Sequence, residues 1–267
     1  GWKGLLDSAF LLRELEEEEH IPVAEAAAER LKDSILSSLE LSAKRLGQIA
    51  IPAGPTRGFD AAMVGSLAAC YPLGLLPASD PWITGTAELV RERFCIDDAF
   101  FQQISHTGLG TYLTLQLAFV ELESKDPRAW SRLRWMLDAA TTTFTWPEAI
   151  HPRLGGGCMG DGHHGWAAAD FLSFVRNVLV RESADDELAV LTILPEEWRG
   201  RPVKVVDALT RFGSLSFEVR WEGDRAVLEW EKSSASAALT APSLSASWRT
   251  RELKGSAMFD AGRVLPG

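Results

Sequence analysis

Cysteine is scarce in this 267-residue chain, and its spacing argues against two common ways of stabilising a fold. The three cysteines, Cys70, Cys95 and Cys158, are odd in number and form no CxxC pair. A disulfide framework needs an even set, and structural zinc sites use closely spaced ligands. The pattern indicates reduced thiols, which favours a cytoplasmic location, and no cofactor is expected.

Long apolar runs, excess positive charge and targeting signals are also missing. No stretch reaches the roughly 18 apolar residues of a membrane span, and the N-terminus lacks the residue order of a signal peptide. The net charge of −10 at pH 7 disfavours nucleic acid and membrane partners and favours neutral or cationic ligands. Because the chain begins with Gly1 instead of Met, we expect it to be a fragment of a longer protein.

The sequence lacks a nucleophile elbow and a glycine-rich nucleotide-binding loop in the structural context that each requires. No Gly-x-Ser-x-Gly elbow follows a strand-like segment, which disfavours a Ser-His-Asp hydrolase. The glycines at 155–157 lie between two expected helices instead of between a strand and a helix. Nucleotide binding therefore lacks its structural context.

The spacing of apolar residues changes its period along the chain and predicts two regions. Residues 1–184 show helical spacing, and residues beyond 187 show the alternation of strands. A run of strands with a turn at 222–224 predicts a β-hairpin. We expect helices at about 2–20, 23–48, 60–73, 82–94, 108–122, 127–143 and 166–180, and strands at about 188–194, 203–209, 213–221, 225–230 and within 233–247.

One glycine-rich loop, residues 146–166, concentrates the side chains that carry chemistry. It holds Glu148, three of the five histidines and two tryptophans. A loop rich in Gly and Pro forms no regular element, so these residues need another reason to gather there. Sugar recognition supplies one, because Trp stacks on a pyranose, His and Asp bind hydroxyls, and a carboxylate activates water.

The same residues also have structural interpretations. Trp146 and Trp166 could belong to the core, and Asp161 could cap the following helix. Adjacent histidines at a helix start point about 100° apart, so they seldom bind one metal ion. No metal site is therefore expected, although zinc-ligand residue types occur at His151, Cys158, Asp161, His163 and His164.

Several features together resemble the six-hairpin glycosidases, a superfamily built on an (α/α)6 barrel. These features are serial helical hairpins, the loop motif Trp-Pro-Glu148, the helix that follows Gly-Asp-Gly-His-His-Gly-Trp166, and a terminal β-region containing Leu-Pro-Glu-Glu-Trp198. The resemblance is to the C-terminal half of glucoamylase-like and trehalase-like enzymes and related sugar phosphorylases. It implies a mainly α fold, in which half of an (α/α) toroid (1–184) precedes a small β-sandwich-like domain (185–267).

The resemblance also implies a function and a set of site residues. The family's catalytic base lies in the loop before the last barrel helix, which assigns this role to Glu148 in an inverting glycoside hydrolase. The family's catalytic acid would lie upstream of Gly1. Asp60 could replace that acid, or it could cap the third helix. The substrate-binding candidates are Trp146, His151, Asp161, His163, His164 and Trp166, together with His106, Arg57 and Asp60.

Three alternatives remain open for the function and the partners. The substrate would be a gluco-configured oligosaccharide or glycoside for a hydrolase, whereas a phosphorylase would use phosphate in place of water. A non-catalytic carbohydrate-binding or assembly module is the third interpretation. Half a barrel leaves apolar helix faces open, so this chain could pair with an upstream half-barrel chain or form a homo-oligomer.

Overall fold

The computed structural model describes residues 1–104, 106–184 and 186–260. They form two compact units, each assembled from two segments of the chain. Unit 1 comprises Gly1–Val120 and Pro147–Asp161, and unit 2 comprises Glu121–Trp146 and Gly162–Gly267. Asp185, the first residue of the expected β-domain, and residues 261–267 at its end lie outside the described residues. The domain boundary between 184 and 185 stays a prediction.

The prediction of a mainly α chain, with half of an (α/α) toroid ahead of the β-region, is wrong. The described residues form a mixed α and β structure with three sheets. One sheet of five strands lies entirely within the region that was expected to be helical. Its strands are two to five residues long, which is too short for an alternating pattern to appear in the sequence.

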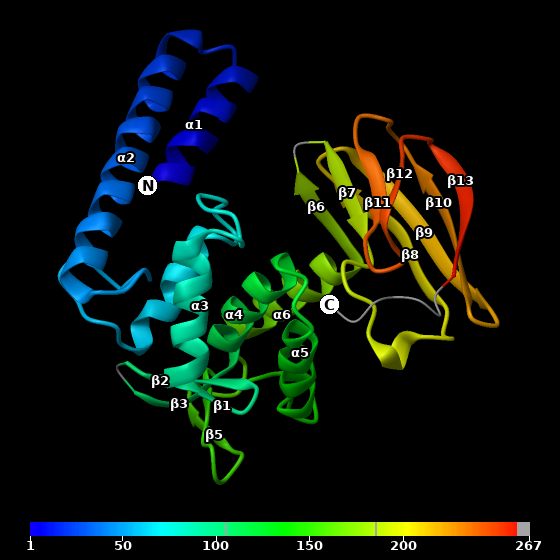
Figure 1. The fold of residues 1–267 in the computed structure, drawn as a ribbon. Coiled ribbons are helices and arrows are strands. Elements are labelled where there is room, and N and C mark those ends of the chain that lie inside the picture. The colour runs from blue at the N-terminus through cyan, green and yellow to red at the C-terminus, as the bar shows by residue number, and fades with distance from the viewer. Residues whose placement is uncertain (105, 185, 261–267) are drawn as a thin grey trace. The chain divides into compact units, whose positions relative to one another are not determined.

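Unit 1 begins with a helical hairpin of α1 (Trp2–Glu14) and α2 (Ile21–Leu46), joined by the short 3-10 helix η1 (Glu18–His20). Figure 1 shows α1 running alongside α2. α1 ends earlier than the sequence predicted, because the chain turns at Glu16, whose φ is positive. Gly47 ends α2 in the left-handed conformation that glycine adopts without a steric penalty.

The core of unit 1 lies where a 3-10 helix and two α-helices meet. η2 (Ala61–Ala69) replaces the third expected α-helix, and α3 (Pro81–Phe94) and α4 (Thr111–Glu123) follow it. Aspartate side chains cap η2 and α3. Each carboxylate accepts a hydrogen bond from a backbone N–H in the first turn of its helix. The fully buried residues at this meeting point include Met63, Leu67, Ile83, Phe100 and Leu117.

A five-stranded antiparallel sheet completes unit 1. The strands lie in chain order, and residues 149–159 return to pair beside β3. Gly108 makes this packing possible, because a Cβ there would lie 2.8 Å from Cys158 Sγ and 2.9 Å from Ala149 Cβ. The strands are β1 (Cys95–Ile96), β2 (Ala99–Gln103), β3 (Thr107–Gly110), β4 (Ala149–Ile150) and β5 (Gly157–Met159).

Unit 2 contains the helices α5 (Arg128–Asp138) and α6 (Gly165–Leu179). The sixth expected helix ends early, at Asp138. Just beyond it, the hydroxyls of Thr141, Thr143 and Thr145 bond to one another. Such local bonds compete with helix formation. Among the described residues, no helix in either unit combines the length and the hydropathy needed to cross a membrane.

The rest of unit 2 consists of two four-stranded sheets, with strand orders β13-β10-β9-β8 and β12-β11-β7-β6. Buried residues from both sheets belong to one hydrophobic cluster. The predicted hairpin is confirmed, since Glu222 pairs with Arg225 across the turn. The elements are β6 (Val180–Ala184), β7 (Glu187–Val190), the 3-10 helix η3 (Glu196–Trp198), β8 (Val203–Thr210), β9 (Gly213–Glu222), β10 (Arg225–Lys232), β11 (Ala238–Ala241), β12 (Ser245–Thr250) and β13 (Lys254–Asp260).

A buried ion pair lies in the helical part of unit 2. Arg132 donates through Nε to Glu121 Oε2 at 2.5 Å and through Nη2 to Oε1 at 2.8 Å. Both side chains are almost completely buried. The two-pronged geometry satisfies both charges where water does not reach them.

Replacing only one partner of this pair should destabilise unit 2 strongly. We expect Arg132→Met to lower the free energy of unfolding by about 3–5 kcal/mol, because the Glu121 carboxylate stays buried without its cation. The double variant Glu121→Leu/Arg132→Met should recover most of this loss. Urea denaturation of the wild type, both single variants and the double variant measures the coupling. A double variant as unstable as Arg132→Met would contradict this account.

Asp170 is a half-buried acid on α6 that forms no ion pair with any described residue. Burial raises the pKa of its carboxyl from the ordinary value of 3.8 to about 6. Between those pH values the folded state therefore holds a proton that the unfolded state releases. The stability contributed at this position consequently falls as the pH rises through this window.

Asp170→Asn should remove this pH dependence. We expect the melting temperature of the variant to match the wild type near pH 4 and to exceed it at pH 7 by on the order of 2 °C. Scanning calorimetry at both pH values measures the difference. Asp138→Asn replaces an exposed aspartate and serves as the matched control. An equal shift at pH 4 and pH 7 would rule out the buried carboxyl as the cause.

Candidate functional site

Glu148 lies beside a histidine from the connection between β2 and β3 of unit 1, and a glutamine of β2 contacts that histidine. Its Oε1 atom is 3.3 Å from His106 Nε2, and the two side chains are 24% and 20% exposed. Gln102, from β2, places its Nε2 atom 2.7 Å from the same His106 nitrogen. The structure thus brings the candidate base together with one of the predicted binding residues.

The backbone around Glu148 is held closely on two sides. Its carbonyl accepts a hydrogen bond from the Thr111 backbone N–H at 3.2 Å, and the Thr111 hydroxyl donates to the Pro147 carbonyl at 2.9 Å. On the other side, a Cβ at Gly160 would lie 3.1 Å from the Glu148 backbone nitrogen. Gly160 also has a φ of +76°, which other residues rarely adopt. These contacts fix the point from which the carboxylate projects.

The two contacts of His106 couple its proton to that of Glu148. When Nε2 carries the ring proton, it donates to an ionised Glu148, and the Gln102 amide must turn its oxygen toward the ring. When Nε2 is unprotonated, it accepts from the Gln102 amide and leaves room for a proton on Glu148. The single lone pair of Nε2 serves one donor at a time, so in this second state it cannot also accept from a protonated Glu148.

His151 and the turn that follows it form a local structure. The His151 Nδ1 atom accepts the backbone N–H groups of Arg153 at 3.1 Å and Leu154 at 3.2 Å. The His151 backbone also exchanges hydrogen bonds with Gly155 and Gly156. Because Nδ1 acts as an acceptor, the proton of the neutral ring lies on Nε2. His151 therefore shapes the turn, and its predicted contact with substrate stays a prediction.

His164 and Trp166 lie together at the start of α6 in unit 2. His164 is the N-cap residue, and its Nδ1 accepts the Ala167 backbone N–H at 3.3 Å. The capping role suggested for Asp161 therefore belongs to His164. The Trp166 ring meets the His164 ring edge-on at 5.6 Å and is 66% exposed. An exposed indole face of this kind can stack on a sugar.

Trp146 is a packing residue of unit 2. Its indole is buried, and Nε1 donates to the Met136 carbonyl at 2.7 Å. Phe171 packs against the indole, with ring centroids 4.8 Å apart. Trp146 therefore occupies the core position that was one of its two sequence interpretations. A sugar cannot stack on a ring that is covered in this way.

Arg57 and Asp60 pair with each other at the start of η2. Arg57 Nε donates to Asp60 Oδ2 at 2.9 Å, and the other carboxylate oxygen accepts the Ala62 N–H at 2.9 Å. Asp60 is thus the N-cap of η2, the helix-capping role that the sequence analysis gave as the alternative to a catalytic acid. Its two oxygens are engaged locally, so this carboxylate offers no ready proton to a substrate.

Asp161 and His163 are both exposed in the glycine-rich loop. Within the described ranges, no three metal-ligating side chains come together as a metal site would require. The sequence did not identify Gln102 or Thr111 as site residues. Gln102 lies between two of the expected helices and Thr111 lies inside one of them. The pairing of β2, β3 and β4 places Gln102 against His106 and Thr111 against the Glu148 backbone.

Part of this chain is similar to solved structures of glycosidases at low sequence identity. No protein-family model and no curated protein sequence matches it. A solved structure named "Glycosidase Wild Type" is similar with a TM-score of 0.47 and 16% identity, over 61% of this chain and 46% of that chain. A glycosidase variant in complex with glucose has a TM-score of 0.44 and 16% identity, over 65% and 44%. This chain thus spans less than half the length of these glycosidases, and the site described above rests on its own geometry.

Proposed function

We propose that this chain is a glycoside hydrolase, or part of one, in which Glu148 acts as the general base of an inverting reaction. The observation that carries the proposal is the position of Glu148, whose backbone is held by Thr111 and Gly160 and whose carboxylate lies 3.3 Å from His106 Nε2. Its loop resembles the one that bears the catalytic base in the six-hairpin glycosidases. The substrate is a gluco-configured oligosaccharide or glycoside.

Glu148 would remove a proton from the water molecule that attacks the anomeric carbon, while a second carboxylic acid, which the residues described here do not identify, would protonate the departing glycosidic oxygen. The ionised carboxylate accepts the His106 Nε2–H before this step and holds the water proton after it. The His106 Nε2–H continues to donate to Oε1, because the water proton is taken up by Oε2. In this scheme His106 and Gln102 are positioning residues, and they keep one carboxylate oxygen occupied while the other faces the water.

Removing the carboxylate should abolish most of the activity. We expect Glu148→Gln to reduce kcat for hydrolysis by at least about 10²-fold, because an amide cannot accept the proton. The assay follows sugar release from a panel of α- and β-linked glucosides and aryl glucosides. The anomer first released is identified by NMR, since an inverting reaction yields the opposite configuration.

The matched control for this experiment is Glu40→Gln, which changes an exposed glutamate on α2 and should leave kcat unchanged. Assays with and without inorganic phosphate distinguish hydrolysis from phosphorolysis, because a phosphorylase releases a sugar phosphate only when phosphate is present. Equal activity of Glu148→Gln and wild type would refute the role of Glu148. A wild type inactive on the whole panel would favour the non-catalytic interpretation.

The α1–α2 hairpin favours assembly as a second function. Phe10 and Leu11 on α1 and Leu15 just after it are 56%, 57% and 69% exposed, and Val23 and Leu41 on α2 are each 66% exposed. Leu15 follows directly after the last residue of α1, and Val23 and Leu41, about five turns apart, share one face of α2, as the 3.6-residue period requires. A hairpin with several exposed apolar side chains is a candidate association surface.

Self-association through the hairpin should depend on these side chains. We expect the wild-type mass to rise with concentration toward a dimer, at concentrations on the order of 10 μM. Leu11→Gln/Leu15→Gln should stay monomeric in the same sedimentation experiment. Leu154→Gln alters an equally exposed leucine in the β4–β5 loop and should associate like the wild type. A wild type that stays monomeric at ten times this concentration would exclude self-association.

A further inference from the structure

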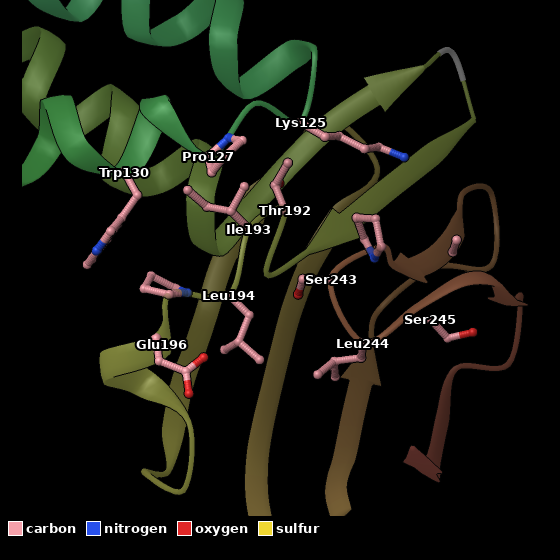
Figure 2. Close-up of a pocket in the computed structure, with 13 residues that line it drawn as sticks. Lys125, Pro127, Trp130, Thr192, Ile193, Leu194, Glu196, Ser243, Leu244 and Ser245 are labelled. Carbon is pink, nitrogen blue, oxygen red and sulfur yellow. The ribbon is translucent and has the colours of Figure 1, made fainter. Parts of the chain in front are cut away.

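Unit 2 contains a cavity that the proposed reaction does not use. Its volume is about 680 Å³, within the range typical of small-molecule sites. Three stretches form its walls: the start of α5, the segment between β7 and η3, and the turn between β11 and β12 (Figure 2). Most of the lining residues are apolar, namely Pro127, Ile193, Leu194, Pro195, Pro242, Leu244 and Ala246.

One wall of the cavity is a tryptophan held in a fixed orientation. Trp130 donates through Nε1 to Glu197 Oε2 at 3.1 Å, and Arg134 pairs with the other oxygen of Glu197 at 2.9 Å. Trp198 packs edge-on against the Trp130 ring, with centroids 5.5 Å apart. The indole is therefore fixed before any ligand arrives, and it presents a flat surface suited to a ring.

The lining includes a buried hydroxyl whose hydrogen-bonding capacity is not used by the described residues. Ser243 Oγ is buried and has no hydrogen-bond partner among the described residues. By contrast, the Thr192 hydroxyl in the same wall donates to the Asn177 carbonyl at 2.7 Å. Figure 2 shows Ser243 between the Ile193–Leu194 segment and Leu244. Because Oγ makes no bond to the described residues, a χ1 rotation that brings this hydroxyl to a ligand would break none.

The charged residues of the lining are not arranged to hold an ionic ligand. Glu196 pairs with Arg199 at 2.8 Å and is largely exposed. The Lys125 amino group points away from Leu194 and Ser243 in Figure 2. Neither charge is directed at the space between Trp130 and Ser243, so this part of the cavity suits a neutral ligand.

We propose that this cavity binds a small neutral molecule with a flat apolar ring and one hydroxyl or carbonyl group, which hydrogen-bonds to Ser243. A sugar would bring a hydroxyl on almost every carbon, and each would lose its water without gaining a partner. An extended peptide would bring a carbonyl with every residue and meets the same difficulty. The site does not include Glu148, so this proposal and the proposed reaction can be tested independently.

The test compares two probes of the same shape, 2-naphthol and 2-methylnaphthalene, by NMR titration of the labelled protein. Both should shift the Trp130 indole N–H signal, and 2-naphthol should bind about 3- to 10-fold more tightly because of the Ser243 hydrogen bond. Ser243→Ala should remove this preference and leave 2-methylnaphthalene binding unchanged. Ser247→Ala, at an exposed position outside the lining, is the matched control and should preserve it.

A second variant tests the cavity itself. Ala246→Trp adds a large side chain at an exposed lining position and should abolish binding of both probes while the protein stays folded. The proposal is overturned if neither probe binds the wild type, if both still bind Ala246→Trp, or if Ser243→Ala keeps the preference for 2-naphthol. A proline-rich peptide that shifts the Trp130 signal when 2-naphthol does not would assign the cavity to peptides instead.

Discussion

The position of Glu148 depends on backbone segments that approach each other more closely than side chains would allow. Gly108 lets β3 lie against β4 and β5, and Gly160 lets the chain pass the Glu148 backbone. Thr111 then joins the first turn of α4 to the segment that carries the carboxylate. A larger residue at Gly108 would push β4 outward and move Glu148 away from His106. The chemistry of the site thus rests on the absence of two side chains.

The histidines show how far residue type alone can predict a role. The glycine-rich loop was identified from its composition, and the structure does place Glu148 beside a histidine. That histidine is His106, from another segment, whereas His151 shapes a turn and His164 caps a helix. In these two roles Nδ1 acts as an acceptor, so protonation of the ring would remove the lone pair that holds the local backbone. Composition located the loop, but hydrogen-bond partners decide what each ring does.

Long elements with a clear period could be predicted from the sequence, and short or non-local ones could not. The 26-residue helix α2 and the β9–β10 hairpin appear close to their expected bounds. The five-stranded sheet was missed because its strands are short and β3 pairs with residues about 40 positions later. Gln102 and Ser243 were missed for a related reason. The proposed role of each residue depends on neighbours that come close to it only in the folded chain.

The interleaving of the two units has a consequence for the growing chain. The first segment of unit 1 ends at Val120, but the strands that complete its sheet come from residues 149–159. During translation one edge of β3 therefore stays unpaired until the ribosome has made the segment from Glu121 to Trp146 and the strand β4 that follows it. An open edge of this kind is a template for wrong pairing. The two-residue length of β4 limits how much edge β3 must leave uncovered until its partner emerges.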